Sequence, residues 1–417
     1  MSTRTQDPIS RAQRFRPTAN TSTQSRRNNS QLPQGFPSII DGSKNWSGVS
    51  SSKPQVHTLV LNESQIAEIG KGFEEFCKKE LDGNEARRDN FPLPTLKDKL
   101  KQCALEIHDG VGVCVIRGIK PECHTNEVNA ILHLALGSYV GDQRGIQNSK
   151  GDVLYHVTNP NYSVTPGKKR HGIHTSEALP FHTDMGCEIL YLQVRGLASE
   201  GGHLCVASMA TIYNDLVQSD PGVLHTLAEA KWPVQVSRRR SPVLRCPLLQ
   251  YHKENLLISM DPARLGPHPA GQNSENQQLT PEQKNALSAI ELRACKHKFR
   301  LELQPGDLVF INNLEVLHAR ESYIDNEFSS RHLVRLWLRN SELGRPIPDS
   351  MKMPWDDVYG NGAEKVRNRT YHIEPMPEYM ECKYSNGTAA FVADGDSSSD
   401  GGDEKDVIHF TNSNGSN

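Results

Sequence analysis

The 417-residue sequence lacks the features that mark several classes of protein. Its nine cysteines include no CxxC pair, and their odd number argues against a disulfide framework or a cysteine zinc site. No apolar stretch approaches the roughly 20 residues that cross a bilayer, and the first residues form no apolar signal segment. We therefore expect a soluble, cytoplasmic protein with reduced cysteines and no membrane partner.

An excess of charge of one sign is also missing. The chain has 47 Lys and Arg against 49 Asp and Glu, which gives a net charge of −2. Nucleic-acid binding usually requires a basic excess, so we expect no nucleic-acid partner. The run Arg238, Arg239 and Arg240 is interpreted as a solvated loop. A homo-oligomer remains open.

Apolar residues are scarce at both ends of the chain. Residues 1–55 are rich in Ser, Thr, Gln, Asn and Arg, and residues 385–417 are acidic and rich in Ser and Gly. Such segments cannot bury enough surface to offset the entropy lost on ordering. We predict a disordered N-terminal arm (1–55), one folded domain (56–384) and a disordered acidic tail (385–417).

The folded region begins with helical patterns and continues with strand patterns. Helical spacing of apolar residues occurs at 63–81, 91–110 and 125–137, and Thr280 and Pro281 predict the start of a further helix near 280–295. A buried strand is predicted at 112–118. From His156 onward, short apolar runs alternate with Gly, Pro and Asn turns. The pattern predicts an α+β, mainly β fold with a barrel or sandwich.

One set of residues is suited to hold a metal. FHTD places His182 and Asp184 two residues apart, so on a strand both side chains point to the same face. HxD is weak evidence alone, but QPGDLVFINNLEVLHAR predicts a turn, a buried strand and then His318. Two imidazoles and one carboxylate form the facial triad of non-haem iron(II) oxygenases, which leaves three positions open on the metal.

Two arginines follow on a predicted strand, RHLVRLWLR. Strand alternation places Arg331, Arg335 and Trp337 on one face. A guanidinium among apolar neighbours is costly unless an anion pairs with it. The distal carboxylate of 2-oxoglutarate would suit Arg331, because the planar fork binds a carboxylate through two bonds. Arg335, one strand step deeper, is a candidate contact for an acidic group of the substrate, or it braces the barrel.

Taken together, these motifs resemble the TauD/TfdA (clavaminate synthase-like) dioxygenase family in its fungal form. The resemblance spans about residues 91–360 and includes LPFHTD, GDLVFINNLEVLHAR and RHLVRLWLR. It implies a double-stranded β-helix barrel of the jelly-roll or cupin-like type with flanking helices. It also implies that iron(II) is held by His182, Asp184 and His318, and that 2-oxoglutarate and O2 are consumed. In the family the first arginine of the pair binds 2-oxoglutarate and the second often faces the substrate, which points to Arg331 and Arg335.

Other substrate contacts are less specific. His156 lies where the family presents substrate-facing loop residues, although a hydrogen-bonded structural histidine is an equally natural interpretation. Ser176 and Leu179, just before FHTD, lie where a pocket wall is expected.

One position departs from the family. A Thr or Ser usually follows the glycine pair by two residues and helps to hold the 2-oxoglutarate carboxylate, but this chain has Leu204. One hydrogen bond is therefore missing, which costs about 1 kcal/mol or somewhat more. We expect weaker cosubstrate affinity unless His203 or another group substitutes.

The expected activity is hydroxylation or desaturation of a small organic substrate, with 2-oxoglutarate and O2 converted to succinate and CO2. Halogenation is disfavoured because Asp184 occupies the position where related halogenases have a small residue. Two alternatives remain: an inactive binding or regulatory protein on the same barrel, motivated by Leu204, and a protein-modifying oxygenase with an open peptide groove.

Overall fold

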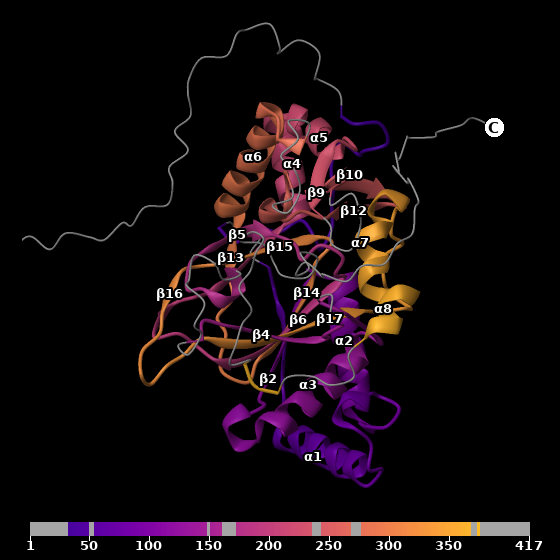
Figure 1. Cartoon of the computed structure of the whole chain (residues 1–417), viewed down its shortest axis with the longest axis vertical. Helices are drawn as coiled ribbons and strands as arrows, with labels where there is room; N and C mark the ends of the chain where they lie inside the picture. Colours follow the sequence, from indigo (N-terminus) through magenta and orange to yellow (C-terminus); the bar gives the residue numbers. More distant parts are fainter. Residues whose placement is uncertain are drawn as a thin grey trace, which may run out of the picture.

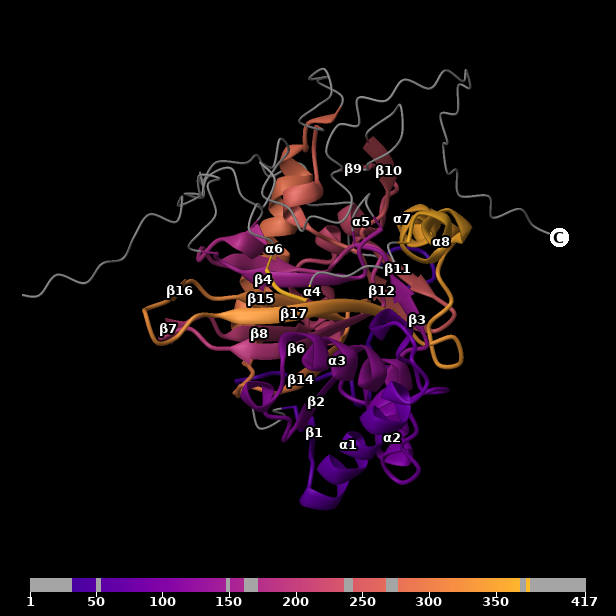
Figure 2. The ribbon, with the colours of Figure 1, turned by 60° about the horizontal axis from the view of Figure 1, so that its bottom comes forward.

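The computed structural model describes residues 32–49, 54–147, 151–160, 172–235, 243–267, 277–367 and 373–375. Strands fill the centre of the molecule, and a group of helices lies at each end (Figure 1; Figure 2). This arrangement confirms the prediction of a mixed fold with a β body and flanking helices.

The larger of the two principal sheets has seven strands. Its order is β1 (His57–Val60), β2 (Val113–Arg117), β14 (Leu308–Asn312), β6 (Ile189–Gly196), β17 (His332–Arg339) and β3 (Gln143–Gly145), and β4 (Leu154–Thr158) also pairs with β17. β1 and β2 are parallel, whereas the other neighbours are antiparallel. Long-range pairing therefore builds the sheet from strands that are distant in sequence.

The smaller principal sheet has four antiparallel strands in the order β13 (Phe299–Arg300), β8 (Leu204–Ser208), β15 (Val316–Arg320) and β5 (Leu179–His182). Three further antiparallel pairs are β9 (Trp232–Gln235) with β10 (Val243–Cys246), β11 (Leu249–His252) with β12 (Asn255–Ile258), and β7 (Glu200–Gly201) with β16 (Tyr323–Ile324).

An apolar layer joins the two principal sheets. Alternation along β6 sends Leu190 and Leu192 into this layer, where they join Val206 of β8 and Leu333 of β17. Tyr191, which lies between the two leucines, points instead into the cluster behind the larger sheet. The side chains that face inward from both sheets therefore determine what can line a cavity between them.

Helices cover the outer sides of both sheets. α1 (Glu63–Cys77), α2 (Leu96–His108) and α3 (Asn126–Val140) pack behind the larger sheet, against residues such as Ile116 and Phe310. α4 (Met209–Ser219), α5 (Pro221–Ala228) and α6 (Pro281–His297) pack behind the smaller sheet, against Ala207 and Leu317. The remaining helices are α7 (Asp349–Tyr359), α8 (Asn361–Val366) and the short 3-10 turns η2 (Gly83–Glu85), η3 (Pro121–Cys123), η5 (Gly172–His174) and η6 (Pro262–Arg264).

The predicted helices are confirmed, with shifts at their ends. The helix near 280–295 begins at Pro281, and Thr280 and Gln283 form a reciprocal capping box. The helix predicted at 91–110 spans only Leu96–His108. Pro94 disfavours helical geometry in the residue before it, so the apolar pattern starts earlier than the helix. No helix in the described part of the chain is both long and apolar enough to span a bilayer.

The structure differs from the expected N-terminal arm. Residues 32–49 pack onto the β body, although the composition predicts disorder through residue 55. Trp46 is only 3% exposed, and its Nε1 donates a 2.9 Å hydrogen bond to the carbonyl of Val111. Tyr213 donates a hydrogen bond to the carbonyl of Pro37. A few large apolar side chains can anchor an otherwise polar segment. Residues 1–31 and the predicted tail 385–417 lie outside the described residues.

Candidate active site

Strand pairing brings the three predicted metal ligands together. β5 and β15 are antiparallel neighbours in which His182 and His318 are direct partners. Asp184 follows β5, and its Oδ1 lies 3.8 Å from Nε2 of His182 and 3.7 Å from Nε2 of His318. One ligand atom from each residue lies within 4.8 Å of the other two. All three residues are buried, so this is a compact set of two nitrogens and one oxygen.

Hydrogen bonds occupy one side-chain atom of His182 and one of Asp184, and they leave the other atom of each side chain free to bind a metal. Nδ1 of His182 lies 2.8 Å from the carbonyl of Pro180, so Nδ1 carries the proton and Nε2 offers its lone pair. Oδ2 of Asp184 accepts hydrogen bonds from Nη1 of Arg335 at 3.0 Å and Nε1 of Trp337 at 2.8 Å. Oδ1 has no hydrogen-bond donor among the described residues. A buried carboxylate oxygen without a donor, beside two imidazoles, fits an iron(II) ion.

The protonation of the site suits metal binding. Burial raises the pKa of Asp184, but Arg335 and the two histidines outweigh it, so the net pKa lies below its usual value. Burial, followed by the neighbouring His182, lowers the pKa of His318 to about 3. At neutral pH the carboxylate is therefore ionised and the His318 imidazole is neutral, which is the ligand form of each.

Asn313 fixes the backbone around Asp184. Its Oδ1 accepts a 2.8 Å hydrogen bond from the Asp184 amide, and its Nδ2 donates 2.7 Å bonds to the carbonyls of Asp184 and Cys187. The local sequence pattern indicates no such role for Asn313. The contact joins residues that are far apart in sequence, so no local signal could reveal it.

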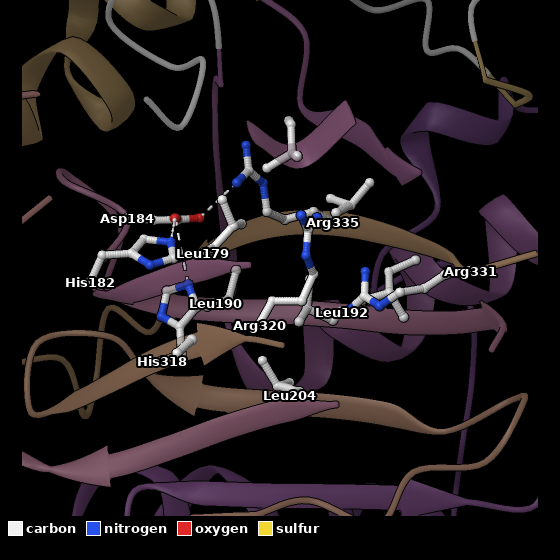
Figure 3. Close-up of a pocket in the computed structure, with 14 residues that line it drawn as sticks. Leu179, His182, Asp184, Leu190, Leu192, Leu204, His318, Arg320, Arg331 and Arg335 are labelled. Atoms are coloured by element: carbon white, nitrogen blue, oxygen red, sulfur yellow. Dashed lines mark hydrogen bonds and ion pairs between the residues drawn. The ribbon is translucent and has the colours of Figure 1, made fainter. Parts of the chain in front are cut away.

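A cavity extends from the triad between the two principal sheets (Figure 3). Its wall is mainly aliphatic, with contributions from Leu179, Leu190, Leu192 and Leu333. Its polar groups are the triad and three arginines, Arg320, Arg331 and Arg335. Among the described residues that line it, Asp184 is the only acidic one, so cationic groups outnumber anionic ones there.

Arg331 lies in this cavity, as predicted. Its Nε donates a 2.9 Å hydrogen bond to the carbonyl of Gly202, and its Nη1 has no partner in the described part of the chain. Burial, followed by the nearby Arg320, lowers the pKa of Arg331 to about 9. A buried cation with an unused donor is a suitable anchor for an anion.

Arg335 has a protein partner in addition to its place in the cavity. Besides the bond to Asp184, its Nε donates a 2.7 Å hydrogen bond to Oε1 of Gln147. The sequence suggested a substrate contact or a brace for the barrel, and the observed bonds hold the carboxylate of Asp184, the predicted metal ligand. Its Nη2 has no partner among the described residues, so a contact with substrate stays a prediction.

The structure places His156 and Ser176 away from the cavity lining. On β4, Tyr155 faces inward near Arg335, and alternation turns His156 to the opposite side of the sheet. There its Nδ1 lies 2.8 Å from Nε2 of His332. Ser176 precedes β5, and its carbonyl accepts a 3.0 Å hydrogen bond from the Tyr323 amide. Of this group only Leu179 lines the cavity.

Leu204 is the first residue of β8, and His203 directly precedes the strand. Leu204 lines the cavity, where the family has a hydroxyl. His203 does not line this cavity. It lines an adjoining one that Leu204 and Arg331 also border, and its Nδ1 lies 3.1 Å from Oε2 of Glu321. Its imidazole is already paired with Glu321, and a role of His203 in place of the missing hydroxyl stays a prediction.

A second group of metal-capable side chains comprises His57, Cys103 and Cys114. Cys103 and Cys114 are 0% exposed and belong to the apolar cluster behind the larger sheet. We interpret both as core residues, because a free cysteine is often buried as a small apolar side chain.

Comparisons with known proteins agree with this geometry. The family model "Taurine catabolism dioxygenase TauD, TfdA family" matches residues 78–337. The taurine hydroxylase-like protein SAT17 of Stachybotrys chartarum is 29% identical over 341 residues, covering 80% of this chain and 88% of that protein. The FR-33289 synthase of Streptomyces rubellomurinus is 27% identical over 329 residues, covering 75% and 93%.

Solved structures share the fold at low sequence identity. An asparagine oxygenase in complex with Fe(II), 3-hydroxyasparagine and succinate aligns with a TM-score of 0.53 at 14% identity, covering 68% of this chain and 94% of that chain. The non-heme iron oxygenase OrfP in complex with Fe and alpha-ketoglutaric acid aligns with a TM-score of 0.51 at 14% identity, covering 69% and 95%. The chain belongs to the TauD/TfdA family, and it is an iron(II)- and 2-oxoglutarate-dependent dioxygenase.

Proposed function

We propose that this dioxygenase hydroxylates a small organic substrate (RH) and converts RH, 2-oxoglutarate and O2 to ROH, succinate and CO2. The observation that carries the proposal is a single cavity with a metal triad at one end and the buried donor of Arg331 at the other. His182, Asp184 and His318 would hold iron(II). Arg331 would hold the distal carboxylate of 2-oxoglutarate. When bound, the iron supplies the oxygen-activating chemistry.

The protein's own residues provide position and exclude water. Arg335 and Trp337 hold Oδ2 of Asp184, so that Oδ1 faces the two histidines. The aliphatic wall formed by Leu190, Leu192 and Leu333 keeps the space beside the triad apolar. Retention of the carboxylate at Asp184 favours hydroxylation over halogenation, and desaturation remains the alternative outcome. Two facing sheets with inward apolar side chains support the double-stranded β-helix interpretation of the fold.

We also propose that the substrate is acidic. Three arginines and one aspartate line the cavity, and a bound iron(II) ion would add two positive charges. The dianion 2-oxoglutarate offsets only part of this excess, and unpaired buried charge is unfavourable. Similarity to a taurine hydroxylase-like protein supports a small molecule as the substrate.

The alternatives have less support. The inactive-protein hypothesis is motivated by Leu204, but an intact triad in which the buried Oδ1 of Asp184 has no donor among the described residues would be hard to explain without a metal. A protein-modifying oxygenase requires a groove for a peptide, and the described cavity is lined mainly by aliphatic side chains that enclose a small space.

The test is succinate formation from 2-oxoglutarate after anaerobic loading with iron(II) and exposure to O2. Wild type is compared with His182→Ala and Asp184→Ala, with and without a panel of small carboxylates, sulfonates and amines. His124→Ala serves as a matched control, because this histidine is exposed and lines neither cavity. We expect iron-dependent succinate that both triad variants lose and the control retains, and stimulation by acidic members of the panel. A folded wild type that binds neither iron nor 2-oxoglutarate would refute the proposal.

A further inference from the structure

Arg320 and Leu204 face each other across two paired strands. β15 and β8 are antiparallel, and these two residues are direct partners in the register. Both side chains line the cavity. Leu204 is 4% exposed and has no polar side-chain atom, although it stands where the family has a hydroxyl for 2-oxoglutarate. Any group that substitutes for this hydroxyl must reach the same part of the cavity. The backbone of Arg320 lies directly beside that of Leu204 in the sheet.

The guanidinium of Arg320 is held firmly but is only partly used. It is 4% exposed, and Nη2 donates to the carbonyls of Gly172 and Glu177, just before β5. Nε and Nη1 have no acceptor among the described residues. Buried N–H groups normally have partners, and an unmade hydrogen bond from a charged group is costly. Two unused donors in a cavity wall indicate an acceptor supplied by a ligand.

Arg320 lies between the triad and Arg331. It follows His318 by two residues on β15, so both side chains project to the same face of the strand. Arg320 and Arg331 both lie over the ring of Tyr323, with guanidinium carbons 5.1 and 5.5 Å from the ring centroid. In Figure 3 the triad, Arg320 and Arg331 follow one another along the cavity. A molecule that reaches from the metal to Arg331 therefore passes Arg320.

The charges in this part of the cavity call for an anion. Asp184 is the only acidic residue in the described part of the lining, and its Oδ2 is already bonded to Arg335. The Glu177 side chain is exposed at the surface. Arg320 and Arg331 thus form a pair of cations, and a dicarboxylate can accept hydrogen bonds from both.

We propose that Arg320 binds 2-oxoglutarate together with Arg331, and that it supplies the hydrogen bond that Leu204 cannot make. This inference rests on the proposed function, because it requires 2-oxoglutarate to lie between the triad and Arg331. Cosubstrate binding in this chain then depends on two guanidiniums in place of one guanidinium and one hydroxyl. Arg320 is a binding residue that the sequence gave no reason to single out.

The test measures the dissociation constant of 2-oxoglutarate by calorimetry on the iron(II)-loaded protein without O2, so that turnover plays no part. The variants are Arg320→Gln, Leu204→Thr, their double mutant, and Arg331→Gln as a reference. We expect Arg320→Gln to weaken 2-oxoglutarate binding about ten- to a hundredfold, as for the loss of a hydrogen bond from a charged group. Leu204→Thr alone should change the constant little, because Arg320 already fills the role.

The double mutant separates binding from a structural role. If Arg320 contacts the cosubstrate, Leu204→Thr restores part of the affinity in the Arg320→Gln background, so the two changes are non-additive. A purely structural loss would not be repaired by a hydroxyl on the neighbouring strand. Arg320→Lys, which keeps the charge but loses the planar fork, should fall between wild type and Arg320→Gln. This variant keeps the test decisive if Arg320→Gln folds poorly.

Two results would overturn the inference, and they differ in what else they exclude. If Arg320→Gln binds 2-oxoglutarate as tightly as wild type while Arg331→Gln binds it weakly, Arg320 is no cosubstrate ligand and the proposed function stands. If iron-loaded wild type binds no 2-oxoglutarate, the proposed function fails and the inference fails with it.

Discussion

Replacement of Trp337 by phenylalanine tests whether contacts behind Asp184 tune the metal site. The indole is 0% exposed, and its Nε1 donates a 2.8 Å hydrogen bond to Oδ2 of Asp184. Phenylalanine keeps an aromatic ring in the core and removes the donor. Arg335 still donates to the same oxygen at 3.0 Å, so the carboxylate loses one of two fixed bonds.

The expected magnitude follows from this geometry. A hydrogen bond to a charged group contributes about 1.5–3 kcal/mol. Loss of a group that orients a metal ligand typically lowers metal affinity about 10–100-fold. Because Arg335 continues to hold Oδ2, we expect Trp337→Phe to weaken iron(II) binding by about tenfold, at the low end of that range.

Trp232→Phe is a closely matched control. Trp232 is also 0% exposed, and its Nε1 donates a 2.8 Å hydrogen bond to the carbonyl of Thr226, in the apolar cluster behind the smaller sheet. Both variants lose a buried indole N–H and similar packing volume. Anaerobic competition with a chelator for iron(II) gives the metal affinity, and chemical denaturation without metal gives the stability.

The comparison separates a local effect on the metal from general destabilisation. We expect both variants to lose stability and only Trp337→Phe to lose iron affinity. If both variants bind iron(II) as tightly as wild type, the bond from Trp337 does not position the carboxylate. An equal loss in both would mean that core packing alone controls the site.

Three further predictions concern stability and the geometry of the site. Burial, with the charges of Arg195 and Arg144, lowers the pKa of His133, so the folded protein excludes a proton that the unfolded chain takes up below about pH 6.5. The free energy of unfolding should therefore fall with pH below that value, by up to about 1.4 kcal/mol per pH unit for this group, and His133→Phe should flatten the dependence measured by urea denaturation. Trp46→Ala should destabilise the protein by about 3–5 kcal/mol, because a buried indole leaves a cavity; an unchanged denaturation midpoint would contradict the packing of residues 32–49. Asn313→Ala should reduce iron affinity at least as much as Trp337→Phe, because three bonds to the backbone around Asp184 are lost, and chelator competition would reveal the change.

Local patterns in the sequence were enough to predict much of the framework. Thr280 and Pro281 predict the start of a helix, because a cap and a first-turn proline are local signals, and the structure has a helix that begins at Pro281 with Thr280 as its cap. Alternation along RHLVRLWLR predicts that Arg331 and Arg335 share a face, and both line the cavity. Family motifs pointed to the fold and to the ligand set, which the pairing of β5 with β15 brings together.

Contacts across the fold could not be predicted in this way. Whether His156 faces the cavity depends on the register of β4 against β17, because a shift of one residue would reverse its direction. The same holds for Arg320, whose position opposite Leu204 follows from the pairing of β15 with β8. Composition likewise could not show that Trp46 would be buried and donate a hydrogen bond to the carbonyl of Val111.

The sequence by itself therefore determined most of the secondary structure, which residues of one strand share a face, and the candidate metal ligands, because these depend on spacing along the chain and on motif chemistry. The tertiary structure alone decided which donors hold Asp184, which arginines remain without an anion, and which side chain stands opposite Leu204. Those outcomes depend on strand register and long-range packing, which place residues from distant segments within hydrogen-bond distance of one another.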